Sequence, residues 1–241
     1  MNTERVIDAI IEWMRNEVES AGKGGVVFGL SGGVDSAVTA YLAHRAFGKE
    51  ALGIMIPIES DPKDLEDAML VVEDLELTHK IVDLEESFHA FLHATGEEVD
   101  KWAASNVKAR MRMVALYYFA QKRDMLVVGS SNKSEFMTGY FTKYGDSASD
   151  LLPLASLYKT EIYELAEALG VPEKIRTKSP SAGLFEGQTD EKDLGITYVE
   201  LDGYLLTGKG EDRVRDRVET LKRNSAHKRI FAPIFDATNL R

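Results

Sequence analysis

The sequence predicts an α/β protein with a doubly wound parallel sheet flanked by helices. Short apolar runs rich in β-branched residues predict buried strands. One begins at Val26, and the others span residues 51–57, 80–84 and 125–129. Helical patterns separate these runs, and this alternation favours parallel pairing. In such sheets ligands bind beyond the carboxyl ends of the strands. We therefore expect the chemistry to lie at residues 30–36, 57–61 and 129–135.

Composition narrows the class of protein. The chain has 241 residues, a formal net charge of −11 and no cysteine. This length suits one α/β domain, and we expect residues 1–241 to form a single domain. The acidic balance argues against a nucleic-acid partner, and the lack of cysteine excludes disulfides, cysteine-bound metals and a cysteine nucleophile. No apolar run is long enough to span a bilayer and no signal-peptide pattern is present, so we expect a cytoplasmic protein that contacts no membrane.

Apolar periodicity and capping residues predict where the helices lie. The first predicted helix is amphipathic and covers residues 3–19, with Asn2 or Thr3 as its cap. Pro62, followed by acidic residues, marks the start of a helix over residues 61–77. The other helices are expected over residues 84–94, 99–121, 156–169 and 211–225.

The turn Ser31-Gly32-Gly33-Val34-Asp35-Ser36 carries the first functional signal. Two adjacent glycines permit conformations in which backbone N–H groups converge, and the helix that follows adds the positive end of its dipole. The two serines add hydroxyl donors, so the turn favours a bound phosphate. Asp35 would repel a phosphate unless a cation lay between them, and it therefore indicates Mg²⁺. An ordinary Gly-Gly turn before a helix is the alternative.

Polar residues also follow the fourth predicted strand. Residues 130–135 bring hydroxyls, an amide and a carboxylate to its carboxyl end. Glu135 is therefore a second candidate ligand for the cation near Asp35. The same residues match a helix-capping pattern with Glu135 in the first turn, and the two interpretations are compatible.

The helix predicted over residues 99–121 has two unusual parts. Residues 113–120 are apolar on almost every side, which predicts burial on every side and a second subunit as part of the cover. Upstream, Arg110 lies among apolar residues, where a guanidinium group usually has a partner. The pattern alone leaves a binding role and a solvated basic turn equally open for Arg110.

Two segments lack both helical and strand periodicity. Residues 136–157 form the longer one, and a long irregular segment inside a compact domain is usually a functional loop. Its Lys143 and Asp150 could bind charged groups and hydroxyls. Residues 179–190 form a second irregular loop.

Basic residues lie at two helix ends. Lys159 falls in the first turn of a predicted helix, where the helix dipole disfavours a cation, so a bound phosphate is expected to compensate. His227 and Lys228 follow the last predicted helix, and complementation of its dipole is the alternative to a binding role.

These motifs, taken in order, resemble those of the ammonia-dependent NAD synthetases. SGGVDS resembles the pyrophosphate loop of the wider group, the N-type ATP pyrophosphatases. The strings GYFTKYGD and SPSAGLFEGQTDE are more specific, and with NVKARMRM, SNKSE, LYKTE and HKR the resemblance covers nearly the whole chain. It implies a Rossmann-like, adenine nucleotide alpha hydrolase-like fold. It also implies a ligase for the last step of NAD biosynthesis, which converts deamido-NAD, ATP and ammonia to NAD, AMP and pyrophosphate through an adenylated carboxylate.

The resemblance also implies roles for individual residues. Asp35 and Lys159 would be catalytic, and Asp35 and Glu135 would hold Mg²⁺. The enzyme would be a homodimer with the dinucleotide across the subunit interface. Ser130 stands where the family often has Thr, which keeps the hydroxyl. The residues implied to bind ATP are Gly29, Leu30, Ser31, Gly32, Gly33, Val34, Asp35, Ser36, Ser130, Lys159 and Ser181, and those implied to bind deamido-NAD are Arg110, Lys143, Asp150, His227 and Lys228.

The nitrogen source and the rival functions follow from what the chain lacks and carries. Glutamine-dependent relatives have an added amidase domain with a cysteine nucleophile, so this chain is expected to use free ammonia unless a separate amidase supplies it. A tRNA-modifying ATPase of the same group is one alternative, and the acidic charge and missing cysteines count against it. A nucleotide sensor without turnover is another, and the paired Asp35 and Glu135 count against that.

Overall fold

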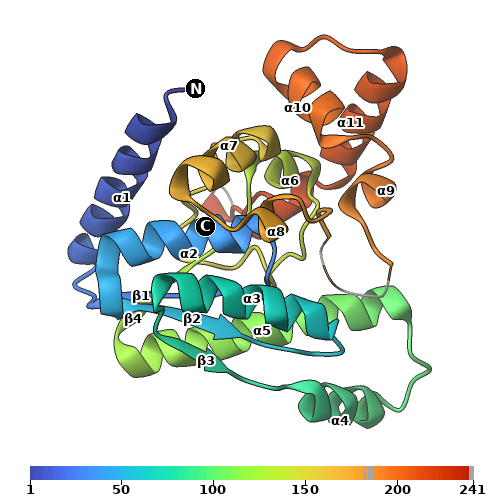
Figure 1. The fold of residues 1–241 in the computed structure, drawn as a ribbon. Coiled ribbons are helices and arrows are strands. Elements are labelled where there is room, and N and C mark those ends of the chain that lie inside the picture. Colours follow the sequence, from blue (N-terminus) through green and yellow to red (C-terminus); the bar gives the residue numbers. More distant parts are fainter. Residues whose placement is uncertain (182, 184–186, 239–241) are drawn as a thin grey trace.

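A parallel sheet with helices on both faces forms the centre of the computed structural model, which describes residues 1–181, 183 and 187–238 (Figure 1). Its strand order is β3-β2-β1-β4. The strands are β1 (Gly25–Gly29), β2 (Ala51–Met55), β3 (His79–Ile81) and β4 (Met125–Val128). All three pairings are parallel, so the predicted fold class is confirmed.

α-Helices follow most of the strands and make up most of the remaining regular structure. They are α1 (Thr3–Ser20), α2 (Val34–Phe47), α3 (Pro62–Leu75), α4 (Glu85–Thr95), α5 (Lys101–Arg123), α6 (Lys133–Thr138), α7 (Lys159–Leu169), α8 (Glu173–Arg176), α9 (Asp190–Leu194), α10 (Tyr198–Thr207) and α11 (Asp212–Asn224). The last two form a hairpin that projects from the sheet region (Figure 1). Within the described ranges, no helix combines the length and the apolar character needed to cross a bilayer.

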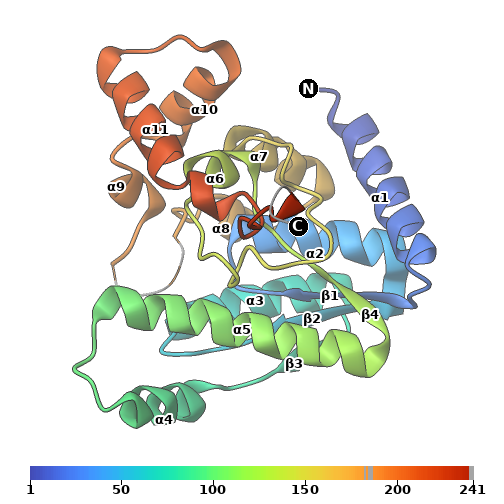
Figure 2. The ribbon, with the colours of Figure 1, turned by 180° about the vertical axis from the view of Figure 1, so that it is seen from behind.

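Alternate residues of the central strand pack against different helices. Val26 and Phe28 lie in a core that includes α2, whereas Val27 lies in a second core with α5. Successive side chains of a strand point to opposite faces, so β1 is buried on both sides. Figure 2 shows α5 along one face of the sheet and α2 along the other.

Several element boundaries differ from the prediction. Helix α7 begins at Lys159 rather than Ser156, because Tyr158 still has extended backbone angles. Part of the segment expected to be irregular is ordered: its first residues complete α6, and Leu151 makes a parallel bridge to Val128 beside β4. The predicted loop over residues 179–190 includes positions 182 and 184–186, which lie outside the described residues.

Within the single chain, helix α5 is buried on one face only, and the prediction for residues 113–120 assigns the rest of the cover to a second subunit. Ala115 and Ala120 are buried against the sheet. Val114 and Tyr118 are 61% and 58% exposed. The apolar pattern therefore marks one face that packs on the sheet and another that no part of the described chain covers.

The order of the strands places the two polar turns beside each other. The chain adds β2 and β3 on one side of β1 and then adds β4 on the other side. The order of strand addition therefore reverses between β1 and β4. Ligands of doubly wound sheets bind at such a switch point. The turn after β1 and the start of α6 after β4 both lie there.

Gly32 is expected to be indispensable for the fold of the turn. Its φ is +77°, and an added Cβ would lie 2.3 Å from the carbonyl oxygen of Asp64. We expect Gly32→Ala to lower the free energy of unfolding in urea by about 3 kcal/mol, because strain and overpacking add. Gly33→Ala is the matched control, because its Cβ would meet only the Ser31 hydroxyl at 3.5 Å. We expect Gly33→Ala to cost less than about 1 kcal/mol. Equal losses would contradict the role given to Gly32.

Candidate active site

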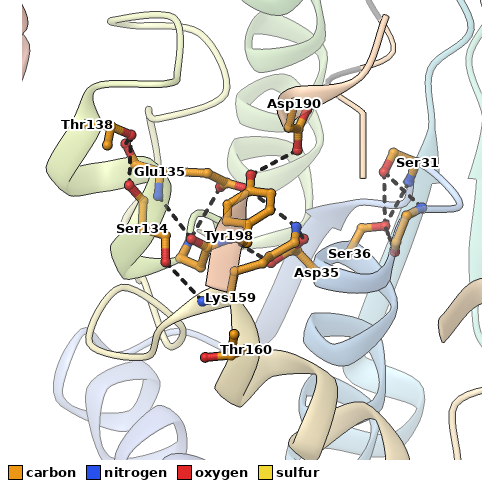
Figure 3. A network of polar contacts seen from close by, with 12 residues as sticks. Ser31, Asp35, Ser36, Ser134, Glu135, Thr138, Lys159, Thr160, Asp190 and Tyr198 are labelled. Atoms are coloured by element: carbon orange, nitrogen blue, oxygen red, sulfur yellow. Dashed lines mark hydrogen bonds and ion pairs between the residues drawn. The ribbon is translucent and has the colours of Figure 1, made fainter. Parts of the chain in front are cut away.

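The turn after β1 is held by its own serines. The Ser36 hydroxyl donates to the carbonyl oxygen of Gly33 at 2.9 Å and accepts from the N–H of Ser31 at 3.2 Å (Figure 3). Gly33 is the N-cap of α2 and has no side chain, so no capping group of its own covers the first N–H groups of the helix. The turn thus brings hydroxyls and a helix N-terminus to one edge of the sheet, an arrangement that suits an anion.

Lys159 lies at the centre of a buried charge cluster. Its side chain is 2% exposed, and its Nζ contacts Asp35 Oδ2 and lies 3.6 Å from Glu135 Oε1. The ring of Tyr198 lies 5.2 Å from the same Nζ. Figure 3 shows that these groups come from α2, α6, α7 and α10 and converge on one point. The structure therefore brings together three of the predicted site residues.

Asn132 links the two carboxylates. Its Nδ2 donates to Asp35 Oδ1 at 2.9 Å, and its Oδ1 accepts from the N–H of Glu135 at 3.0 Å. The Glu135 carboxylate accepts in turn from the N–H of Asn132, which completes a capping box at the start of α6. The capping interpretation of Glu135 is confirmed, and the same residue also faces Lys159.

Burial and charge set the protonation of the cluster. Burial, assisted by the neighbouring Asp35 charge, raises the pKa of Glu135 to about 8. Burial alone would lower the pKa of Lys159, but the nearby Asp35 and Glu135 outweigh it and raise that pKa. Burial also raises the pKa of Asp190, which is hydrogen bonded to Tyr198 at 2.9 Å. Lys159 therefore stays charged at neutral pH, with the Asp35 carboxylate in direct contact with its ammonium group.

A cavity of about 530 Å³ opens beside this cluster. It lies at the carboxyl ends of β1, β2 and β4 and is bounded on one side by α5. Most of the residues predicted to bind ATP line it: Gly29, Leu30, Ser31, Gly33, Val34, Asp35, Ser36, Ser130, Lys159 and Ser181. Gly32 is outside this lining and acts through the shape of the turn.

The residues predicted to bind deamido-NAD are distributed differently. Lys228 lines the cavity, but the other four do not. Arg110 donates to the carbonyl oxygen of Lys143 at 3.3 Å, and the Lys143 Nζ donates to the carbonyl oxygen of His227 at 2.6 Å. These three form a basic group outside the cavity. Asp150 lies apart from them, where it accepts from the N–H of Val127 at 2.7 Å.

Sequence reasoning missed the guanidinium group that faces the cavity. Arg112, not Arg110, lines it and donates to the carbonyl oxygen of Ile56 at 3.1 Å and to Ser60 Oγ at 3.2 Å. Burial lowers the pKa of this guanidinium. Helical periodicity places Arg112 on the same face of α5 as Ser105 and Ala109, which also line the cavity. This shared face could have identified Arg112 from the sequence.

The donor set fits a hard divalent cation. Asp35 and Glu135 offer carboxylate oxygens, and the ammonium group of Lys159 shows that the space between them accepts positive charge. In the described part of the chain, no group of three or more His, Cys, Asp or Glu side chains is arranged to hold a metal. Two carboxylates are enough for Mg²⁺ where phosphate oxygens and water complete its shell.

Comparisons with known proteins show which sequences and structures this chain resembles. The family model described as NAD synthase matches residues 6–234. A protein of Finegoldia magna named NH(3)-dependent NAD(+) synthetase is 50% identical over 236 residues, which cover 98% of both chains. The structure of an NMN synthetase from Francisella tularensis has a TM-score of 0.95 at 35% identity and covers 98% of this chain and 99% of that one. An NH3-dependent NAD synthetase from Campylobacter jejuni, solved with nitrate, has a TM-score of 0.83 at 31% identity and covers 98% and 100%.

The raised pKa of Glu135 makes stability depend on pH. The pKa of Glu135 is about 8 in the folded chain against an ordinary 4.5. Its contribution to the free energy of unfolding is therefore complete below about pH 4.5 and is lost as the pH rises through 8. Glu135→Gln removes this loss and keeps the capping acceptor. We expect the Tm of the variant, measured with a chelator, to rise relative to wild type between pH 5 and pH 9.

Glu161→Gln is the control for that measurement. Glu161 accepts from the N–H of Tyr158 at 2.9 Å in the same kind of capping contact at the start of α7. A Tm difference that grows equally with pH in both variants would rule out the Lys159 cluster as its source.

Proposed function

This chain belongs to the NAD synthase family, and we propose how its residues carry out the ammonia-dependent synthesis of NAD. The activity is that of a ligase, which joins ammonia to a nicotinate carboxylate at the expense of ATP. In the proposed course, deamido-NAD, ATP and ammonia give NAD, AMP and pyrophosphate through an adenylated carboxylate. The buried cluster of Lys159, Asp35 and Glu135 beside the glycine turn is the observation that carries the proposal.

Amide formation requires the carboxylate of the substrate to be activated before ammonia can attack its carbon. A carboxylate resists attack by an amine because oxide is a poor leaving group. In the first step a carboxylate oxygen bonds to the α-phosphorus of ATP, and the bond to the bridging oxygen of pyrophosphate breaks. In the second step ammonia bonds to the acyl carbon, a proton is lost and AMP leaves. Both steps need negative charge to be stabilised at the α-phosphate.

The described residues divide these tasks. The turn from Ser31 to Ser36 would hold the β- and γ-phosphates with its hydroxyls and the N-terminus of α2. Lys159 would stabilise charge at the α-phosphate, because its ammonium group is buried and fixed before substrate arrives. Mg²⁺ held by Asp35 and Glu135 would supply further positive charge to the phosphate oxygens.

The basic group outside the cavity suits the second nucleotide. Arg110, Lys143 and His227 lie together through backbone contacts. We place the distal part of deamido-NAD against them and its nicotinate end in the cavity near Lys228. The uncovered face of α5, with Val114 and Tyr118, supports a homodimer of single-domain subunits in which the partner covers this region.

A mononucleotide is the second candidate for the acid substrate. The fold of this chain matches the NMN synthetase of Francisella tularensis with a TM-score of 0.95, against 0.83 for the NAD synthetase of Campylobacter jejuni. A mononucleotide would fill the cavity without reaching the outer basic group. The close relatives named as NAD synthetases favour the dinucleotide.

An assay with ATP, Mg²⁺, ammonium and either deamido-NAD or nicotinic acid mononucleotide tests the proposal. We expect equal amounts of AMP and amidated product, with the dinucleotide as the better substrate by kcat/KM. Asp35→Ala and Lys159→Ala should each lower kcat by about 100-fold or more while the circular dichroism spectrum is retained. Release of ADP and phosphate, or wild-type turnover in either variant, would overturn the assigned mechanism.

Lys143→Ala tests the position of the second nucleotide. The variant removes a cation from the outer basic group and leaves the cavity lining intact. We expect the KM for deamido-NAD to rise about 10-fold and the KM for ATP to change less than about 2-fold. Lys23→Ala is a control, because its Nζ pairs with Asp124 before β1, away from the cavity and from the outer basic group. Equal effects of Lys143→Ala on both KM values would contradict this placement.

A further inference from the structure

A buried carboxylate from the projecting hairpin reaches the start of α7. Asp202 lies on α10 and is 4% exposed. Its Oδ2 accepts from the N–H of Thr160 at 2.9 Å, and its Oδ1 accepts from the hydroxyl of Ser134. Asp202 therefore joins α10 to both α6 and α7, the helices that carry Glu135 and Lys159.

Ser134 extends this contact to the backbone of Lys159. Its hydroxyl accepts from the N–H of Lys159 at 3.0 Å while it donates to Asp202. Its carbonyl oxygen accepts from Thr138 at 2.7 Å inside α6 (Figure 3). Since Ser134 is fully buried, the hydroxyl has a single arrangement that satisfies both partners.

The first turn of α7 depends on these two side chains. A helix leaves its first N–H groups without internal partners, and a polar residue at the N-cap usually accepts from them. The N-cap here is Tyr158, which provides no side-chain hydrogen bond. Ser134 and Asp202 take over this task for the N–H groups of Lys159 and Thr160. The backbone of Lys159 is thus linked to α10 through the hydroxyl of Ser134.

The same helix also touches the other end of Lys159. Tyr198 lies four residues before Asp202, so both side chains lie on one face of α10. The Tyr198 ring lies 5.2 Å from Lys159 Nζ. One helix face therefore reaches the backbone of Lys159 through Ser134 and lies beside its ammonium group.

We propose that Asp202 is a positioning residue for the adenylation reaction, which sets the place of Lys159 by capping α7 directly and through Ser134. This inference rests on the proposed function, in which Lys159 acts on the α-phosphate. Asp202 touches neither the cavity nor the reacting atoms. It acts by fixing the backbone from which the ammonium group extends.

The variant Asp202→Asn tests this role, because an amide is nearly the same size but can no longer accept from both donors as an anion does. We expect kcat for AMP formation to fall about 10- to 100-fold and the Kd for MgATP, measured by calorimetry, to rise about 10-fold. In a Lys159→Met background the same change should alter the Kd by less than about 2-fold, because the positioned group is gone.

Glu200→Gln is the matched control on the same helix. Glu200 caps the start of α10 and pairs with Arg213, but the described contacts do not link it to Lys159. It should lower Tm and leave kcat and the Kd for MgATP within about 2-fold of wild type. If Asp202→Asn does not fold, Ser134→Ala, which removes only the relaying hydroxyl, should show the same pattern.

Two results would overturn the inference. One is an Asp202→Asn variant with lowered Tm but wild-type kcat and Kd. The other is an equal rise in Kd with and without the Lys159 ammonium group, which would indicate a general loss of structure. Failure of the wild-type protein to form AMP would instead refute the proposed function, and the MgATP measurements would still report on Asp202.

Discussion

The ion pair between Lys159 and Asp35 is the constraint on which the rest of the site depends. An ammonium group that is 2% exposed has lost nearly all of its water, and such a loss is tolerated only with close anionic partners. Asp35 supplies an anionic partner from the turn after β1, and the carboxyl of Glu135, at the start of α6 after β4, lies 3.6 Å from the same ammonium group. Removing one partner of a buried pair commonly costs about 3–5 kcal/mol. Lys159 therefore connects α7 to the segments that follow β1 and β4 on the two sides of the switch point.

This arrangement explains why distant segments of the chain are required at one point. The glycine turn can present donors to a phosphate by itself, but it carries no fixed cation. Lys159 supplies one from more than a hundred residues further along the chain, and α10, still further away, caps the start of the helix that carries it. The projecting hairpin thus contributes to the site although it lies outside the sheet and its two covering layers (Figure 1).

Local patterns predicted the sheet, the glycine turn and the end of β4, because each depends on a few neighbouring residues. The roles proposed for Lys159 and Glu135 were suggested by local features of the sequence. Lys159 is a cation at the end of a helix that disfavours one, and Glu135 is an acid in a capping position. Arg112 was missed because choosing between it and Arg110 requires the rotation of α5 about its axis. Asp202 could not be identified, since its partners are separated from it by about 40 residues or more and its own neighbourhood is an ordinary amphipathic helix.

The charge balance of the site argues for the order in which its ligands arrive. Asp35, Glu135 and Asp190 surround a single ammonium group, so the cluster is negative whenever the three acids are ionised. Burial, assisted by the Asp35 charge, keeps the pKa of Glu135 near 8, which leaves this carboxyl largely protonated at neutral pH. The phosphates of a nucleoside triphosphate without metal would be repelled by the acids of this cluster. A divalent cation would instead favour the ionised form of Glu135. On the proposed function, the site is therefore built to accept the nucleotide together with its metal, and the acids are part of what recognises that complex.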